Sequence, residues 1–164
     1  MSILLRRILA GGIDLILIWV YAGLLFLLVK TITALESVLA TSNPFVGQLI
    51  GFVMLTLPVF CYFYFFEKSS RAATFGKRFT KIKVQKGGAI IKRNILKLAP
   101  WELAHTGVHG MYYYSNHGDH IPYWVWFFLI TPQILVLVYF ISIIYTKGHS
   151  SLYDTWSNNC LIRN

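Results

Sequence analysis

Three long stretches with almost no charged residues dominate the pattern of hydrophobic and polar positions along the chain. They cover residues 8–29, 45–66 and 123–146, and each reaches the roughly 20 apolar residues that a helix needs to cross a bilayer. Clusters of Tyr, Phe and Trp within residues 62–66 and 123–126 are typical of the membrane–water interface. The pattern predicts an all-α integral membrane protein.

Residues 98–114 form a shorter apolar stretch that carries Glu102, and the distribution of basic residues indicates whether it crosses the membrane. With four spans and both termini in the cytoplasm, fourteen of the 15 Lys and Arg residues lie inside and only Lys30 lies outside. If residues 98–114 only rest on the membrane, the division becomes 12 to 3. Because basic residues concentrate in cytoplasmic segments, we predict a four-helix transmembrane bundle in the cell membrane, built as one domain over residues 1–164.

The segment between the second and third spans, residues 67–97, holds ten of the basic residues. Residues 81–85 alternate polar and apolar side chains, and Gly87-Gly88 offers a two-residue turn before residues 89–91. This pattern predicts a short cytoplasmic β-hairpin. Its basic side chains should face anionic lipid headgroups, and the candidates are Lys77, Arg78, Lys81 and Lys83.

Composition agrees with a membrane protein and argues against several other classes. Hydrophobic residues make up 56% of the chain and charged residues only 13%, against about 25% charged in soluble domains. The net charge is +9, and most of the basic residues that produce it lie beside apolar spans. We therefore expect the protein to contact anionic lipid headgroups and not to bind nucleic acid. The two cysteines suggest no disulfide framework, and the chain has no nucleophile elbow and no dinucleotide fingerprint. We therefore expect no enzyme.

Asp14 lies inside the first apolar stretch, where a carboxylate costs about 2.5–3.5 kcal/mol to insert. Arg7 precedes it by seven residues, which places both side chains on nearly one helix face, roughly 10 Å apart along the axis. Two interpretations remain open: Asp14 binds an ion or ligand, or it pairs with a cation or caps backbone groups of another helix.

A second polar group lies on the predicted third span. Glu102, His105 and His109 fall within about 60° of one helix face, and such side chains bind Zn²⁺ or similar divalent ions. The same face is also compatible with a proton pathway or with plain hydrogen bonding.

Local motifs add two further expectations. Gly47 and Gly51 have the spacing that lets another helix approach closely, and Pro58 should kink the second span. Residues 150–154 resemble a helix N-terminus in which Asp154 caps the helix or pairs with the basic segment.

Three separated segments together resemble one family. They read R-x-x-A-x-x-I-D at residues 7–14, T-F-G-K-R at residues 74–78, and S-L-Y-D at residues 151–154. In this combination they are similar to the RDD family of multi-pass membrane proteins, which is named for one arginine and two aspartates. The resemblance implies that Arg7, Asp14 and Asp154 are the corresponding residues.

The resemblance also implies transport, because transport of unidentified ligands has been proposed for the family and sodium/proton antiport attributed to some members. We expect cation- or proton-coupled transport, with Na⁺ or a proton at Asp14, while Arg7 tunes that site and engages Asp154 or a lipid phosphate. Four spans enclose little space, so we expect a homodimer or a larger assembly. The alternatives are a non-transporting scaffold that binds lipid or a protein, and a metal-binding membrane protein.

Overall fold

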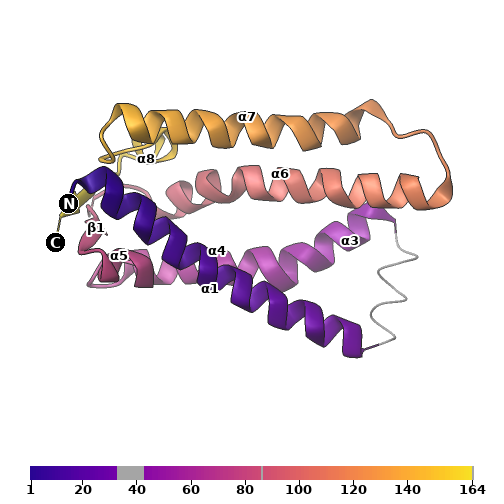
Figure 1. Ribbon diagram of the computed structural model, residues 1–164, viewed down its shortest axis with the longest axis horizontal. Helices are drawn as coiled ribbons and strands as arrows, with labels where there is room; N and C mark the ends of the chain where they lie inside the picture. The colour runs from indigo at the N-terminus through magenta and orange to yellow at the C-terminus, as the bar shows by residue number, and fades with distance from the viewer. Residues whose placement is uncertain (33–42, 86, 164) are drawn as a thin grey trace.

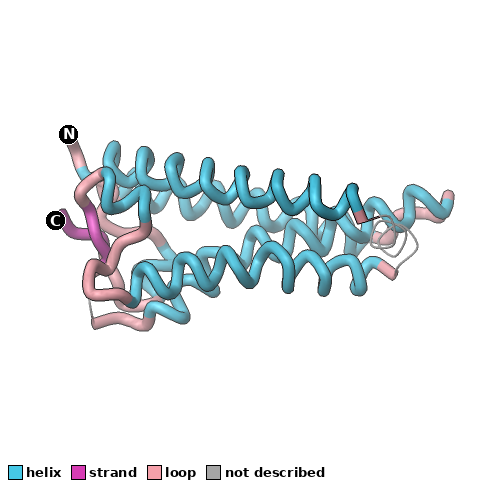
Figure 2. The backbone as a smooth tube through the Cα atoms, turned by 90° about the horizontal axis from the view of Figure 1, so that it is seen from below, coloured by secondary structure: helices cyan, strands magenta, loops and turns pink. Residues whose placement is uncertain are grey.

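The computed structural model of the chain describes residues 1–32, 43–85 and 87–163. Within these residues, long helices extend along the long axis, and both termini lie at one end of the molecule (Figure 1; Figure 2). The first long helix is α1 (Ile3–Thr31). The second is one continuous helix made of α3 (Pro44–Gly51), the π-helical turn η1 (Phe52–Thr56) and α4 (Leu57–Lys68). The other two long helices are α6 (Ile90–His117) and α7 (Tyr123–Tyr145).

The short elements gather at the end that holds both termini (Figure 1). They are α5 (Phe75–Phe79), β1 (Ile82–Val84), α8 (Leu152–Trp156) and β2 (Leu161–Arg163). The strands β1 and β2 pair antiparallel, with Val84 opposite Leu161. The buried side chains of Ile82, Val84 and Leu161 pack with Ala10 of α1 into a small apolar core.

The predicted hairpin within residues 81–91 is therefore wrong, because β1 takes its partner from the end of the chain and residue 90 already begins α6. Gly88 explains the difference. A Cβ atom there would lie 2.3 Å from the carbonyl oxygen of Asn158, so this glycine lets the chain pass closely against the C-terminal tail. The Ala89 amide then donates a hydrogen bond of 2.9 Å to the Ser157 carbonyl.

Three helical segments in the described part of the chain are long and apolar enough to cross a membrane: Ile3–Thr31, Pro44–Lys68 and Tyr123–Tyr145. The remaining long helix, α6, has 28 residues and is about 42 Å long, which is sufficient in length. Its Glu, Lys, Arg and His residues keep it out of the apolar group. Three of the four predicted spans thus correspond to helices that are able, by length and composition, to cross a membrane.

Glycines allow α6 to approach its neighbours closely. A Cβ atom on Gly107 would lie 2.9 Å from the Leu129 backbone nitrogen of α7, and one on Gly110 would lie 2.7 Å from the Trp124 ring. On the other side of α6, a Cβ atom on Gly47 would lie 2.9 Å from Nδ1 of His109. The glycine spacing in α3 thus serves helix packing within this chain.

A π-helical turn interrupts the regular α-helix of the second span next to Pro58, the residue at which the sequence predicts a kink. The π-helical turn η1 directly precedes α4, in whose first turn Pro58 lies. The Tyr21 hydroxyl of α1 donates a hydrogen bond to the Met54 carbonyl inside this turn. A neighbouring helix thus satisfies a carbonyl where the regular pattern is interrupted.

Candidate functional site

The buried face of α1 carries Arg7, Ala10 and Asp14, with exposed fractions of 7%, 2% and 4%. The prediction that Arg7 and Asp14 share one helix face is confirmed. Their polar contacts are nevertheless different, because Arg7 binds the C-terminal region and Asp14 binds the segment that follows the second span.

Asp14 accepts hydrogen bonds from three donors. The Tyr62 hydroxyl of α4 lies 2.7 Å from Oδ1, the Thr74 hydroxyl 2.6 Å from Oδ2, and the Gly76 amide 2.9 Å from Oδ1. Gly76 permits this approach, since a Cβ atom on it would lie 2.1 Å from the Ala10 carbonyl oxygen. Asp14 thus joins α1 to α4 and α5, and it forms no ion pair within the described residues.

Arg7 contacts Asp154, one of the two partners expected for it. Its Nη2 atom lies 2.6 Å from Oδ2 of Asp154 and donates to the Tyr153 hydroxyl at 2.9 Å, while Nη1 donates to the Gly148 carbonyl at 3.1 Å. Asp154 also forms a capping box with Ser151 at the start of α8, which confirms the predicted helix N-terminus.

The Arg7–Asp154 pair belongs to a longer series of buried ion pairs. Nε of Arg93 lies 2.6 Å from Oδ1 of Asp154, and Nη1 of Arg93 pairs with Glu67 at the end of α4. Glu67 also pairs with Lys77 and accepts a hydrogen bond of 3.1 Å from Asn94. Alternating charges therefore form a buried ion-pair chain, which consists of Arg7, Asp154, Arg93, Glu67 and Lys77.

This buried ion-pair chain holds α1, α4, α5, α6 and α8 together at the end with both termini. Burial on its own raises the pKa of the Asp154 carboxyl, but the guanidinium groups of Arg93 and Arg7 outweigh burial and hold that pKa below its usual range. Removing one member of such a network leaves an uncompensated buried charge, at a cost of about 3–5 kcal/mol.

The expected lipid-facing basic residues divide into two groups. Lys77 was predicted to face lipid headgroups, but this prediction is wrong. The Lys77 side chain is buried, and its ammonium group pairs with Glu67 in the buried ion-pair chain. Arg78 is half-buried, with Nε donating to the Ala73 carbonyl at 2.9 Å. Lys81 is exposed and Lys83 is half-exposed, so both remain available to headgroups.

Sequence reasoning missed Glu67 and Arg93, the central members of the chain of ion pairs. Glu67 is the single acidic residue among the ten basic residues of segment 67–97, and this isolation was the available signal. Arg93 looked like one more residue of a basic loop. Its burial follows from its place in the first turn of α6, on the face turned toward Glu67 and Asp154.

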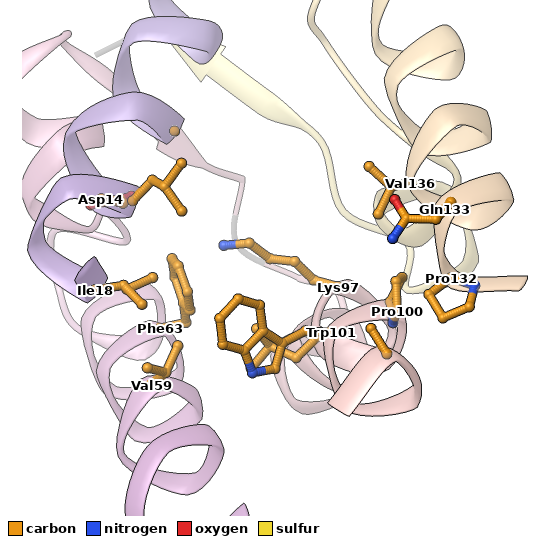
Figure 3. A pocket seen from close by; sticks show the side chains of 14 residues that line it. Asp14, Ile18, Val59, Phe63, Lys97, Pro100, Trp101, Pro132, Gln133 and Val136 are labelled. Carbon is orange, nitrogen blue, oxygen red and sulfur yellow. The ribbon is translucent and has the colours of Figure 1, made fainter. Parts of the chain in front are cut away.

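A cavity of about 420 Å³ lies between α1, α4, α6 and α7 (Figure 3). It adjoins a more polar cavity of about 260 Å³ beside the buried ion-pair chain, and both are lined by Gly11, Asp14 and Lys97. Lys97 extends from α6 toward α1, with Nζ 3.1 Å from the centroid of the Phe63 ring (Figure 3). No carboxylate of the described residues forms an ion pair with Lys97.

The structure does not bring Glu102, His105 and His109 together as metal ligands. Glu102 pairs with Gln48 of α3, Nδ1 of His105 lies 3.0 Å from the Trp101 carbonyl oxygen, and the His109 ring packs on Gly47. Within the described residues no three His, Cys, Asp or Glu side chains form a group able to hold a metal ion. The contacts of Glu102 and His105 are those of the hydrogen-bonding interpretation, and His109 makes packing contacts.

A comparison with protein families matches residues 2–158 to the RDD family. The chain belongs to the RDD family. No curated protein and no solved structure matches it. Of the residues to which the resemblance points, Arg7 and Asp154 form an ion pair, while Asp14 lies apart and lines both cavities.

Proposed function

We propose that this RDD protein is a cation- or proton-coupled carrier of the cell membrane, with Asp14 as the coupling site. The observation that carries the proposal is the position of two oppositely charged side chains without ion-pair partners. Asp14 and Lys97 line the same cavities, and each lacks an ion pair within the described residues. A carrier needs buried charged side chains that its ion or substrate neutralises when it binds. Asp14 and Lys97 meet this requirement because no neighbouring side chain of the described residues forms an ion pair with either of them.

Asp14 suits the coupling role because the other buried carboxylates are already neutralised. Glu67 and Asp154 each pair with two cations, whereas the partners of Asp14 among the described residues are hydrogen-bond donors without a charge. A proton or Na⁺ at Asp14 would remove the cost of an uncompensated buried charge, which amounts to several kcal/mol. Two of its donors are hydroxyl groups, which are able to turn and accept a bond from a protonated Asp14.

For the topology, we propose that α6 is the fourth span and that the end with both termini faces the cytoplasm. An even number of crossings agrees with termini at one end (Figure 1), and the basic asymmetry agrees with that end lying inside. Single cysteines introduced at Asn116 and Ser70, in a variant without Cys61 and Cys160, test the orientation. The first should react with an impermeant reagent added outside, and the second should react only after permeabilisation. Thr41, which the four-span topology also predicts to lie outside, is not among the described residues.

Transport is tested with purified protein in liposomes that carry a pH gradient. Addition of Na⁺, K⁺ or Li⁺ should dissipate the gradient in proteoliposomes and leave empty liposomes unchanged. Lys97→Gln should change the rate because it alters the charge that faces Asp14, whereas Lys92→Gln, an exposed residue of the same helix, should not. Equal gradients with and without protein, for every cation, would contradict the carrier.

The main alternative is a non-transporting scaffold, and one observation favours it. The three donors around Asp14 come from α4 and α5 and would hold α1 in place even if no ion ever bound. A scaffold predicts that Asp14→Asn lowers stability without any flux to lose. A carrier predicts loss of flux in a protein that remains folded.

A further inference from the structure

We infer that the cavity between α1, α4, α6 and α7 binds a single-chain anionic amphiphile, a long-chain carboxylate of the fatty-acid type. Its carboxylate would lie at Lys97 and its hydrocarbon chain in the apolar part of the cavity. This inference names the cargo class of the proposed carrier and rests on that proposal for the transport step. Binding is a separate property and is measured without any gradient.

The charged side chains at the polar end of the cavity have a net charge of one positive unit, which one negative charge on a ligand would balance. The cations that line the two cavities are Arg7, Lys77, Arg93 and Lys97, and the carboxylates that line the cavities or pair with these cations are Asp14, Glu67 and Asp154. One positive charge of this set is left over, and of these four cations Lys97 forms no ion pair with a described residue. A monoanionic head balances this set, whereas a doubly charged phosphate would leave a negative excess next to Asp14.

The remainder of the cavity is built for a hydrocarbon chain. Its walls come from all four helices, and its volume of about 420 Å³ falls within the range of about 300–1,000 Å³ of small-molecule sites. Figure 3 shows apolar side chains that line the cavity around Lys97; they include Ile18, Val59, Phe63, Trp101 and Val136. An amphiphile with a charged head and an apolar tail matches this division into a polar and an apolar end.

The cavity is accessible from the side that faces lipid. Leu15 of α1 and Val136 of α7 both line it, and their exposed fractions are 42% and 54%. On spans as apolar as α1 and α7, such exposed side chains contact the bilayer. An amphiphile dissolved in the membrane therefore reaches the cavity laterally, without first entering water.

Equilibrium binding of radiolabelled palmitate to the purified full-length protein in detergent tests the inference. Palmitate should bind saturably and be displaced by unlabelled palmitate, but not by hexadecanol, which has the same chain without the charge. Lys97→Gln should weaken binding on the order of tenfold or more, and Lys92→Gln should leave it unchanged. Displacement of the label by hexadecyl phosphate at far lower concentrations than by unlabelled palmitate would overturn the carboxylate assignment, and equal displacement by hexadecanol would overturn the role of Lys97.

A second pair of variants fills the cavity without touching its charges. Gly11 lines both cavities, and a Cβ atom on it meets nothing within 4 Å, so Gly11→Leu should fold and block the passage between them. The neighbouring Gly12 is equally open and lines neither cavity, which makes Gly12→Leu the matched control. Palmitate binding should be lost in Gly11→Leu only. Unchanged binding in a folded Gly11→Leu protein overturns the inference.

The outcomes separate this inference from the proposed function. Saturable, Lys97-dependent palmitate binding in a protein that dissipates no pH gradient would support the binding site and contradict the carrier. Cation-driven flux in a protein that binds no palmitate would support the carrier and contradict the amphiphile as its cargo.

Discussion

Arg93 joins the two halves of the buried ion-pair chain, so its removal should produce the largest loss of stability of any basic residue in segment 67–97. Arg93→Met keeps an unbranched side chain of similar length and removes two charge-assisted contacts, one to Asp154 and one to Glu67. Each such contact contributes about 1.5–3 kcal/mol. The variant also avoids the cost of removing the Arg93 guanidinium from water, which offsets part of the lost contact energy. The expected net destabilisation is about 3–5 kcal/mol.

Thermal unfolding of the purified protein in detergent at neutral pH measures this effect. For a chain of this size, the loss corresponds to a decrease in unfolding temperature of about 6–20 °C. Arg93→Lys should recover only part of it, since one ammonium group does not span two carboxylates as a guanidinium does. Lys92→Met, next to it and exposed, should stay within about 0.5 kcal/mol of the wild type. An Arg93→Met protein as stable as Lys92→Met would refute the reasoning.

Three further predictions concern stability and are measured in the same way. Asp14→Ala leaves three hydrogen-bond donors without their acceptor and should lower the free energy of unfolding by about 1–3 kcal/mol for each buried donor. Asp14→Asn keeps one acceptor oxygen and should cost clearly less. Equal losses of stability in the two variants would contradict this prediction. Because the pKa of Asp154 is lowered in the folded protein, ionised Asp154 contributes its full share of stability above about pH 4, and this share is lost as the pH falls through the lower folded pKa. The free energy of unfolding should therefore stay constant from pH 7 to about pH 5. A decline by pH 6 that Asp154→Asn abolishes would contradict this prediction. Gly76→Ala should destabilise strongly, because its Cβ atom would lie 2.1 Å from a backbone oxygen of Ala10, while Gly12→Ala should be tolerated.

The sequence predicts well what depends on neighbours along the chain. Runs of apolar residues locate the spans that became α1 and α7, and helical periodicity places Arg7 and Asp14 on one face. The hydroxyl and carboxylate spacing of residues 151–154 predicts the start of α8. Each of these patterns is local, so it is visible within the segment that forms the element.

Contacts between distant segments could not be predicted in this way. β1 and β2 have three residues each, too few for their alternation to show that Val84 pairs with Leu161 rather than with a nearer segment. The contact of Arg93 with Glu67 depends on how α6 packs against α4, which no local pattern records. For the same reason Lys77 looked like a surface residue, although its partner lies ten residues away at the end of α4.

The central claim is that Asp14 couples ion movement to transport, and the flux of Asp14→Asn in liposomes tests it most directly. The measurement compares cation-driven dissipation of a pH gradient by the wild type and by Asp14→Asn, at equal protein content and with folding verified by thermal unfolding. The account predicts that the wild type dissipates the gradient and that folded Asp14→Asn does not. A folded Asp14→Asn protein that retains the full wild-type rate would contradict it.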